Sequence, residues 1–108
     1  MPKKYSLFWA ISAKKDLNDI IDYISIDSHQ TAIQKLEQLE KVANDIINFP
    51  KKGRIIPELE KNNITIYREI IFNPWRIFYK IEDFKIYIMA IIDGRRNIEE
   101  ILLRRQLR

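Results

Sequence analysis

Residues 64–92 read ITIYREIIFNPWRIFYKIEDFKIYIMAII, and the rest of the chain must be built around this stretch. It contains three β-rich runs, 64–71, 75–81 and 84–92, with turn residues between them. Consecutive strands with such short links pair as an antiparallel meander. The third run is almost continuously apolar, which predicts a central strand that is covered on both faces.

A strand and two helices are predicted before this stretch. Residues 5–11 alternate as a strand, and Ser12 is expected to cap a helix that begins at Ala13. Ser28 is expected to cap a second helix over residues 29–48, which ends where Phe49-Pro50 resists helical geometry. Both helices carry apolar residues at helical spacing, and the short break between them predicts an antiparallel hairpin.

These elements predict one α+β domain over residues 1–108, in the order β-α-α-β-β-β. The N-terminal strand and the meander are expected to form one twisted four-stranded sheet, with the helical hairpin on one face. Residues 51–59 read as a loop, and residues 98–107 as a short amphipathic helix or tail. The apolar stripe of that C-terminal segment (Ile98, Ile101 and Leu102) either covers the sheet or receives a helix from a partner.

Composition excludes several classes of protein. The 108 residues include no cysteine and a single histidine, His29, so disulfides, thiol catalysis and zinc sites built from several His and Cys are ruled out. No apolar run reaches the roughly 18 residues of a membrane-spanning helix. We expect a cytoplasmic protein without metal or cofactor, in which His29 is a surface or capping residue.

Three aspartates are spaced three residues apart on the first predicted helix: Asp16, Asp19 and Asp22. This spacing places them on one face, where they could chelate a metal ion. A solvated helix face is the favoured interpretation, since the opposite face is accounted for as core.

Charge is distributed unevenly along the chain. Residues 51–108 carry 13 Lys or Arg and 8 Asp or Glu, whereas residues 1–50 carry 6 and 7. A basic half is typical of a protein that meets an anionic partner, although an uneven solvated surface explains it equally well.

Arginines are the most distinctive feature of the basic half. Arg68 and Arg76 lie in neighbouring predicted strands, and opposite residues of such strands come within about 5 Å. A concave sheet face lined with guanidinium groups would bind phosphates or carboxylates in forked geometry. The alternative is ordinary ion pairing, of Arg68 with Glu58 or Glu69 and of Arg76 with Asp83. The candidate target- or phosphate-binding residues are Arg54, Arg68, Arg76, Tyr79, Arg95 and Arg96.

Aromatic residues interleave with these arginines and suit either base stacking or a sheet core. For Trp75, Phe78 and Tyr87 the core is favoured.

An ordered set of segments resembles the RelE/ParE superfamily of toxins from type II toxin–antitoxin systems, nearly from end to end. The matching segments are AKKDLNDIIDYI at 13–24, FPKKGR at 49–54 with PEL at 57–59, YRE at 67–69, WRIFYKI at 75–81 and DGRR at 93–96. The resemblance implies the same order of elements and a small growth-inhibiting toxin, of the kind that stabilises plasmids. A cognate antitoxin with an acidic C-terminal region would neutralise it in a higher-order complex. The implied antitoxin-binding residues are Arg95, Arg96, Ile98, Ile101, Leu102 and Arg104.

The superfamily divides by target. RelE-like members are ribosome-dependent mRNA endoribonucleases (mRNA interferases), and the resemblance would give Arg76, Arg96 and Arg54 the catalytic roles. Such nucleases commonly carry a C-terminal tyrosine or histidine, whereas here no Tyr or His follows Tyr87. ParE-like members inhibit DNA gyrase without chemistry of their own. The missing residue and the basic C-terminal end favour the ParE-like branch, while an inactive toxin-like binding module is a third alternative.

Overall fold

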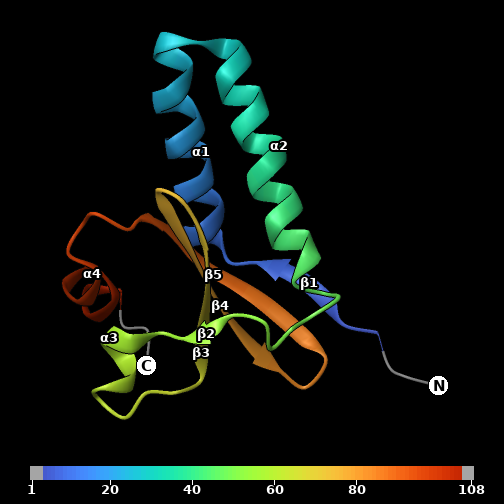
Figure 1. Ribbon diagram of the computed structural model, residues 1–108, viewed down its shortest axis with the longest axis vertical. Helices are drawn as coiled ribbons and strands as arrows, with labels where there is room; N and C mark the ends of the chain where they lie inside the picture. The colour runs from blue at the N-terminus through green and yellow to red at the C-terminus, as the bar shows by residue number, and fades with distance from the viewer. Residues whose placement is uncertain (1–3, 106–108) are drawn as a thin grey trace.

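The computed structural model describes residues 4–105 and has the expected α+β architecture (Figure 1). A helical hairpin, at the top of Figure 1, rises beyond the sheet, and two short helices lie together at the lower left. The elements are β1 (Ser6–Trp9), α1 (Ile11–Asp27), α2 (His29–Asp45), β2 (Arg54–Ile55), α3 (Pro57–Glu60), β3 (Tyr67–Phe72), β4 (Trp75–Glu82), β5 (Lys85–Asp93) and α4 (Ile98–Arg104).

The sheet has five strands in the order β1-β5-β4-β3-β2, so the predicted number of four was wrong. The additional strand, β2, and the one-turn helix α3 lie in the segment expected to be a loop. A two-residue strand is too short to show alternation of apolar and polar residues, so no sequence pattern announces it. The meander β3-β4-β5 is antiparallel as predicted, whereas β1 pairs in parallel with β5.

The N-terminal cap of α1 differs from the prediction, whereas that of α2 is as predicted. Helix α1 starts at Ile11 after Ala10, which makes no side-chain capping bond. Ser12, the expected cap, instead donates its hydroxyl to the Met89 carbonyl of β5. Ser28 does cap α2, since its hydroxyl oxygen accepts from the Thr31 amide at 3.1 Å.

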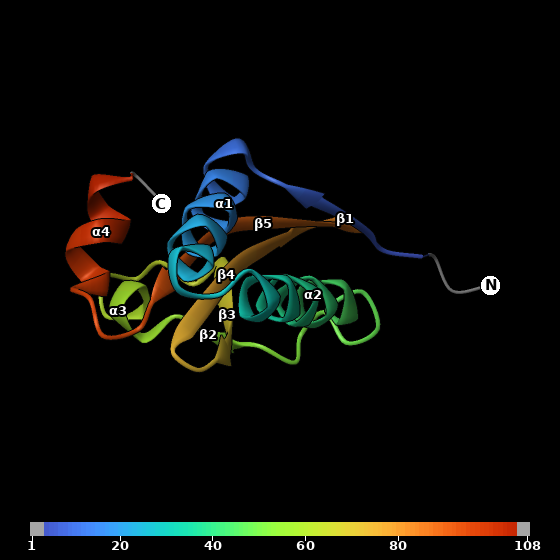
Figure 2. The same cartoon turned by 90° about the horizontal axis from the view of Figure 1, so that it is seen from above.

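Each face of the sheet has its own hydrophobic core. The helices that cover the two cores are separate, and Figure 2 shows α3 and α4 side by side, away from α2. Alternate residues of β4 supply the two cores, because successive side chains point to opposite faces. Ile77 packs under the α1–α2 hairpin, and Phe78 packs under α3 and α4. Strand β5 lies between β1 and β4 and contributes to both cores, as its apolar run predicted. Trp75 is also buried, and Tyr87 is partly buried against Phe8.

Helix α4 decides between the two alternatives for the C-terminal stripe. Ile98, Ile101 and Leu102 are 4%, 8% and 0% exposed and pack in the core on the α3–α4 face. They cover the sheet of their own chain, which was the first of the two alternatives expected for this stripe. Among the residues of this helix that were expected to bind an antitoxin, only Arg104 remains exposed, and it pairs with Glu100 one turn earlier.

No helix within residues 4–105 has the length and the apolar character needed to cross a membrane.

Candidate functional site

Arg76 lies at the centre of a buried network of charges on the α3–α4 face. Its two terminal nitrogens donate to the two carboxylate oxygens of Glu58, both at 2.8 Å. Its Nε donates to Glu69 Oε1, and Arg54 Nε donates to the other oxygen of Glu69 at 2.6 Å. The Glu69 side chain is fully buried and the Arg76 side chain is 11% exposed. Two arginines therefore share two glutamates, and their charges balance.

Two elements bring this network together. Glu58 comes from the one-turn helix α3, which begins with Pro57 at its first position, where the missing N–H costs no hydrogen bond. Glu69 comes from β3, on the same face as Arg76, because Ile71 pairs with Arg76 and Glu69 pairs with Phe78. The Arg76 guanidinium lowers the pKa of Glu58 through its hydrogen bonds, and the two glutamates raise the pKa of Arg76. The fixed planar fork of the guanidinium suits this bidentate contact.

The expectation that Arg68 and Arg76 share a neighbourhood was wrong. Arg68 pairs with Tyr79 across β4 and therefore points to the opposite face of the sheet from Arg76. Its guanidinium donates to the carbonyl of Gly53 at 2.7 Å and to that of Lys51 at 3.4 Å. The ion pairs also differ from those expected. Glu58 and Glu69 pair with Arg76 instead of Arg68, and Arg76 does not pair with Asp83.

Arg68 and Tyr79 together hold the loop before β2. The Tyr79 hydroxyl donates to the Pro50 carbonyl at 2.7 Å and accepts from the Gly53 amide at 3.0 Å. Burial raises the pKa of this hydroxyl. A Cβ at Gly53 would lie 2.5 Å from both the Glu69 carbonyl oxygen and the Tyr79 hydroxyl, so only glycine lets the loop approach so closely. Both residues thus position a loop through bonds within the chain.

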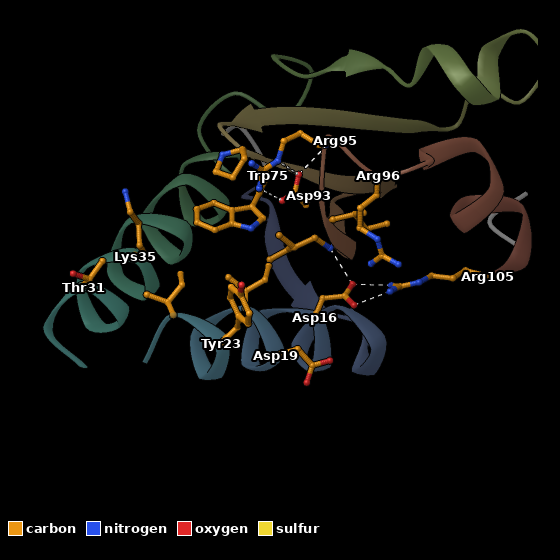
Figure 3. Close-up of a pocket in the computed structure, with 15 residues that line it drawn as sticks. Asp16, Asp19, Tyr23, Thr31, Lys35, Trp75, Asp93, Arg95, Arg96 and Arg105 are labelled. Atoms are coloured by element: carbon orange, nitrogen blue, oxygen red, sulfur yellow. Dashed lines mark hydrogen bonds and ion pairs between the residues drawn. The ribbon is translucent and has the colours of Figure 1, made fainter. Parts of the chain in front are cut away.

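A second candidate site is a cavity of about 790 Å³ between the helical hairpin and the end of β5 (Figure 3). About half of its lining is uncharged, and includes Ile20, Ile24, Trp75 and Ile91. The charged lining residues are Asp16, Asp19, Lys35, Asp93, Arg95, Arg96 and Arg105.

The carboxylates of this cavity already have cationic partners. Asp16 receives two bonds of 2.7 Å from Arg105 and a third, of 3.1 Å, from the Ile91 amide. Arg95 pairs with Asp93 at 2.6 Å and, through its side-chain and main-chain bonds, lowers the pKa of Asp93 to about 2. Asp19 pairs with Lys15 on the helix surface. The carboxylates of the cavity are therefore engaged in ion pairs. Residues 4–105 include no group of three or more potential metal ligands.

Arg96 differs from its neighbours. Its main-chain amide bonds to the Asp93 carbonyl, but within residues 4–105 its guanidinium makes no hydrogen bond or ion pair. Figure 3 shows that guanidinium directed toward the Asp16–Arg105 pair, on the same side of the cavity. The uncommitted charge at this cavity is therefore positive.

A family model for the ParE toxin of type II toxin–antitoxin systems, parDE, matches residues 7–98. The chain belongs to the ParE toxin family. The ParE-like resemblance expected from the sequence is thereby confirmed. Among solved structures, a chain of the chromosomal ParDE TA system from P. aeruginosa has a TM-score of 0.68, covering 83% of this chain and 96% of that one. At 18% identity this likeness shows the fold alone. No curated protein sequence matches the chain.

Within this ParE-family toxin, the sequence candidates fall into three separate places. Arg54 and Arg76 share the buried network, Arg68 and Tyr79 hold the loop on the other face, and Arg95 and Arg96 line the cavity beside α1. The sequence named Glu58, Glu69 and Asp16 with other partners or roles than the structure gives them, and it missed Arg105, the partner of Asp16. Glu69 carried one usable signal, because a charged residue flanked by Ile-rich strand sequence on the buried side of a meander requires a partner.

Proposed function

We propose that this chain is a toxin that inhibits DNA gyrase by binding, without chemistry of its own, and that a cognate antitoxin neutralises it. The observation that carries the proposal is the occupied state of Arg76. An arginine that binds a scissile phosphate must offer its guanidinium to the substrate, but this one already donates from all three of its nitrogens to Glu58 and Glu69, and its side chain is 11% exposed. The Tyr79 hydroxyl, on the opposite face of the sheet, is also committed, since it bonds to Pro50 and Gly53. A general acid or base must be within hydrogen-bond reach of the proton it moves, and this network offers no uncommitted one.

A supercoiling assay with purified gyrase tests the proposal. The refolded or antitoxin-stripped chain is added to gyrase and relaxed plasmid, and we expect supercoiling to fall as the chain reaches molar excess over the enzyme. Arg76→Ala is assayed beside it, and because this change disrupts the buried network, the folded fraction of the variant is measured by circular dichroism before the assay. Normal supercoiling with an excess of chain that arrests growth in cells would refute gyrase as the target.

Toeprinting on translating ribosomes tests the ribosome-dependent endoribonuclease. Cleavage within codons that is lost in Arg76→Ala would replace our proposal with that alternative. If neither assay responds and induced expression leaves growth unchanged, the chain is an inactive binding module.

The antitoxin is proposed to use the cavity beside α1. This cavity combines an apolar lining with a free guanidinium at Arg96 and an exposed one at Arg95. An amphipathic segment with acidic side chains is the complementary ligand, because carboxylates pair with guanidinium groups in bidentate geometry.

Charge reversal tests this assignment. We expect Arg96→Glu to weaken antitoxin binding at least tenfold and to reduce its salt dependence. Because the charge of Arg96 also helps to lower the pKa of Asp93, the unfolding transition of the variant is measured beside its binding. Lys41→Glu is the matched control, because Lys41 is an exposed residue of α2 that does not line the cavity. If both variants bind the antitoxin like the original chain at low and high salt, the antitoxin does not bind in this cavity.

A further inference from the structure

Strand β1 forms one border of the sheet and is paired on one side only (Figure 2). The amides of Ser6 and Ala10 both donate to carbonyls on the β5 side, at 2.9 Å each. Main-chain groups of successive strand residues point to opposite sides, so those of Leu7 and Trp9 point away from β5. Within residues 4–105 no hydrogen bond reaches the main chain of Leu7 or Trp9. The outer edge of β1 is therefore an open row of donors and acceptors.

This edge carries no charged residue. Residues 5–13 read YSLFWAISA, without a charged side chain or a proline. Natural sheets usually blunt an exposed edge with lysine, proline or a bulge, because free main-chain groups attract another strand. The strand is short, but Ala10 beyond it keeps an extended main chain, with φ −62° and ψ 150°. The outer edge of β1 is thus suited to pairing with an added strand.

The main chain of this edge is complementary to itself. In an antiparallel pair, residues that exchange both main-chain bonds alternate with residues that exchange none. A two-fold axis at Leu7 sets Leu7 opposite Leu7 of a second copy, and Tyr5 opposite Trp9 of that copy. By the alternation along β1, these are the residues whose main-chain groups point outward. The outward donors of one copy would therefore meet the outward acceptors of the other.

The side chains match under the same pairing. Phe8 is 44% exposed and stacks on Tyr87, with 5.5 Å between the ring centroids. In the paired strands Phe8 lies opposite Ser6 of the second copy and diagonal to Phe8 of that copy. Diagonal neighbours on one face lie about 7–8 Å apart, which aromatic side chains span. The two Phe8 rings would therefore cover each other's exposed surface.

Charge decides between a second copy and the antitoxin proposed above. An acidic segment along β1 would find no cation between Lys4 and Lys14. A second copy brings no like charges into opposition, because Lys4 of one copy faces Ala10 of the other. Two-fold oligomers are built on self-complementary patches of this kind. The uncharged edge therefore favours a second copy.

We propose that two copies of the chain pair through their β1 strands, antiparallel about a two-fold axis at Leu7. The two sheets then form one continuous sheet, with both α1–α2 hairpins on the same face of it. No residue of β1 lines the cavity beside α1, so the pairing does not use the surface proposed for the antitoxin. It is also independent of the target of the toxin. A contact of one short strand is small, and small interfaces are transient, so the dimer depends on concentration.

The mass of the full chain at increasing concentration tests the proposal. In sedimentation equilibrium we expect the weight-average mass to rise from one copy toward two between about 1 µM and about 1 mM. Phe8→Lys places like charges diagonally across the axis, so we expect it to weaken the pairing at least tenfold. Ile33→Lys, at a residue of α2 that is 54% exposed, is the matched control and is expected to pair like the original chain. A chain that stays monomeric throughout this range, or a mass that rises beyond two copies, would overturn the proposal.

A proline at Leu7 tests the main-chain bonds. Leu7→Pro removes an N–H that makes no hydrogen bond within residues 4–105, and proline is tolerated on strand edges. We expect this variant to pair at least tenfold more weakly. Leu7→Ala shortens the same side chain but keeps the N–H, and it is expected to pair within a few-fold of the original chain. Equal pairing of the two variants would contradict a main-chain ladder at β1.

Introduced cysteines test the register, since the chain has no cysteine of its own. Ser6 of one copy and Phe8 of the other form a pair without main-chain bonds, about 4.5 Å apart at Cα, a distance that a disulfide spans. Two copies of either residue lie diagonally, at about 7–8 Å, which is too far. We expect a mixture of Ser6→Cys and Phe8→Cys chains to cross-link at least tenfold faster than either variant alone. Equal rates would rule out the two-fold register.

Discussion

At the scale of single residues, Glu69 joins the two arginines of the buried network. It accepts hydrogen bonds from Arg54 and Arg76 with its two oxygens, and it is fully buried. Taking a carboxylate out of water is costly, so the two guanidinium groups must remain in place to offset that cost. Arg76, which a nuclease would need free, is thus fixed by Glu69 on the neighbouring strand.

Removing the charge of Glu69 tests this dependence. We expect Glu69→Gln to lower the free energy of unfolding by about 3 kcal/mol, because a buried guanidinium then lacks part of its compensation. Glu82→Gln is the control, since Glu82 pairs with Lys80 at a side chain that is 57% exposed, and exposed pairs contribute about 0–1 kcal/mol. Urea unfolding at neutral pH measures both, and equal effects would contradict the role given to Glu69.

Glu58 makes part of the stability depend on pH. Its pKa in the folded chain lies below the ordinary value of 4.5, chiefly because Arg76 donates hydrogen bonds to it. A lowered pKa contributes stability that is present above pH 4.5 and is lost as the pH falls through the folded value. We expect Glu58→Gln to be destabilised relative to the original chain at pH 7 and to approach it at about pH 3. A difference that stays constant across this range, in urea unfolding, would rule out the ionised pair as its source.

At the scale of elements, α4 completes the core on the face away from the helical hairpin. Its buried side chains pack with α3 and with Phe78 and Ala90 of the sheet, and Lys61 forms an ion pair with Glu99 between α3 and α4. Figure 1 shows these two helices next to each other although nearly forty residues separate them in the sequence. The face that carries Arg76 is therefore closed by the last element of the chain.

Substitutions at two adjacent leucines test how much α4 contributes to the stability of the chain. Leu102 is fully buried and Leu103 is 46% exposed, and both lie on the same turn of helix. We expect Leu102→Ala to destabilise the chain by about 2–5 kcal/mol, because the truncation leaves a cavity in the core. Leu103→Ala is expected to cost less than about 0.5 kcal/mol. Similar unfolding midpoints for the two variants would show that α4 does not cover the sheet in solution.

At the scale of the whole molecule, the sequence predicted the order of elements because the spacing of apolar residues in a long segment indicates whether it is a helix or a strand. The hairpin of α1 and α2 and the meander of β3 to β5 are such segments. The short elements β2 and α3 were missed, and with them the partner that α3 brings to Arg76. Such a contact depends on the tertiary placement of a single turn, which no local pattern encodes.

The opposed faces of Arg68 and Arg76 were within reach of sequence reasoning. The two-residue turn Asn73-Pro74 pairs Phe72 with Trp75, and counting outward pairs Arg68 with Tyr79 and Ile71 with Arg76. Since side chains alternate along a strand, Arg68 and Arg76 then fall on opposite faces. The expected proximity of the two arginines rested on the short distance between neighbouring strands and left out the alternation of side chains between the two faces.

The parallel pairing of β1 with β5 has a consequence for synthesis of the protein. Ser6 pairs with Lys85, and β1 has no neighbour besides β5 within residues 4–105. During translation the first strand must therefore wait for the last strand to emerge, while the helices between them can already form. Sheet closure is therefore a late event, and a nascent chain that is interrupted before β5 leaves the ribosome with β1 unpaired.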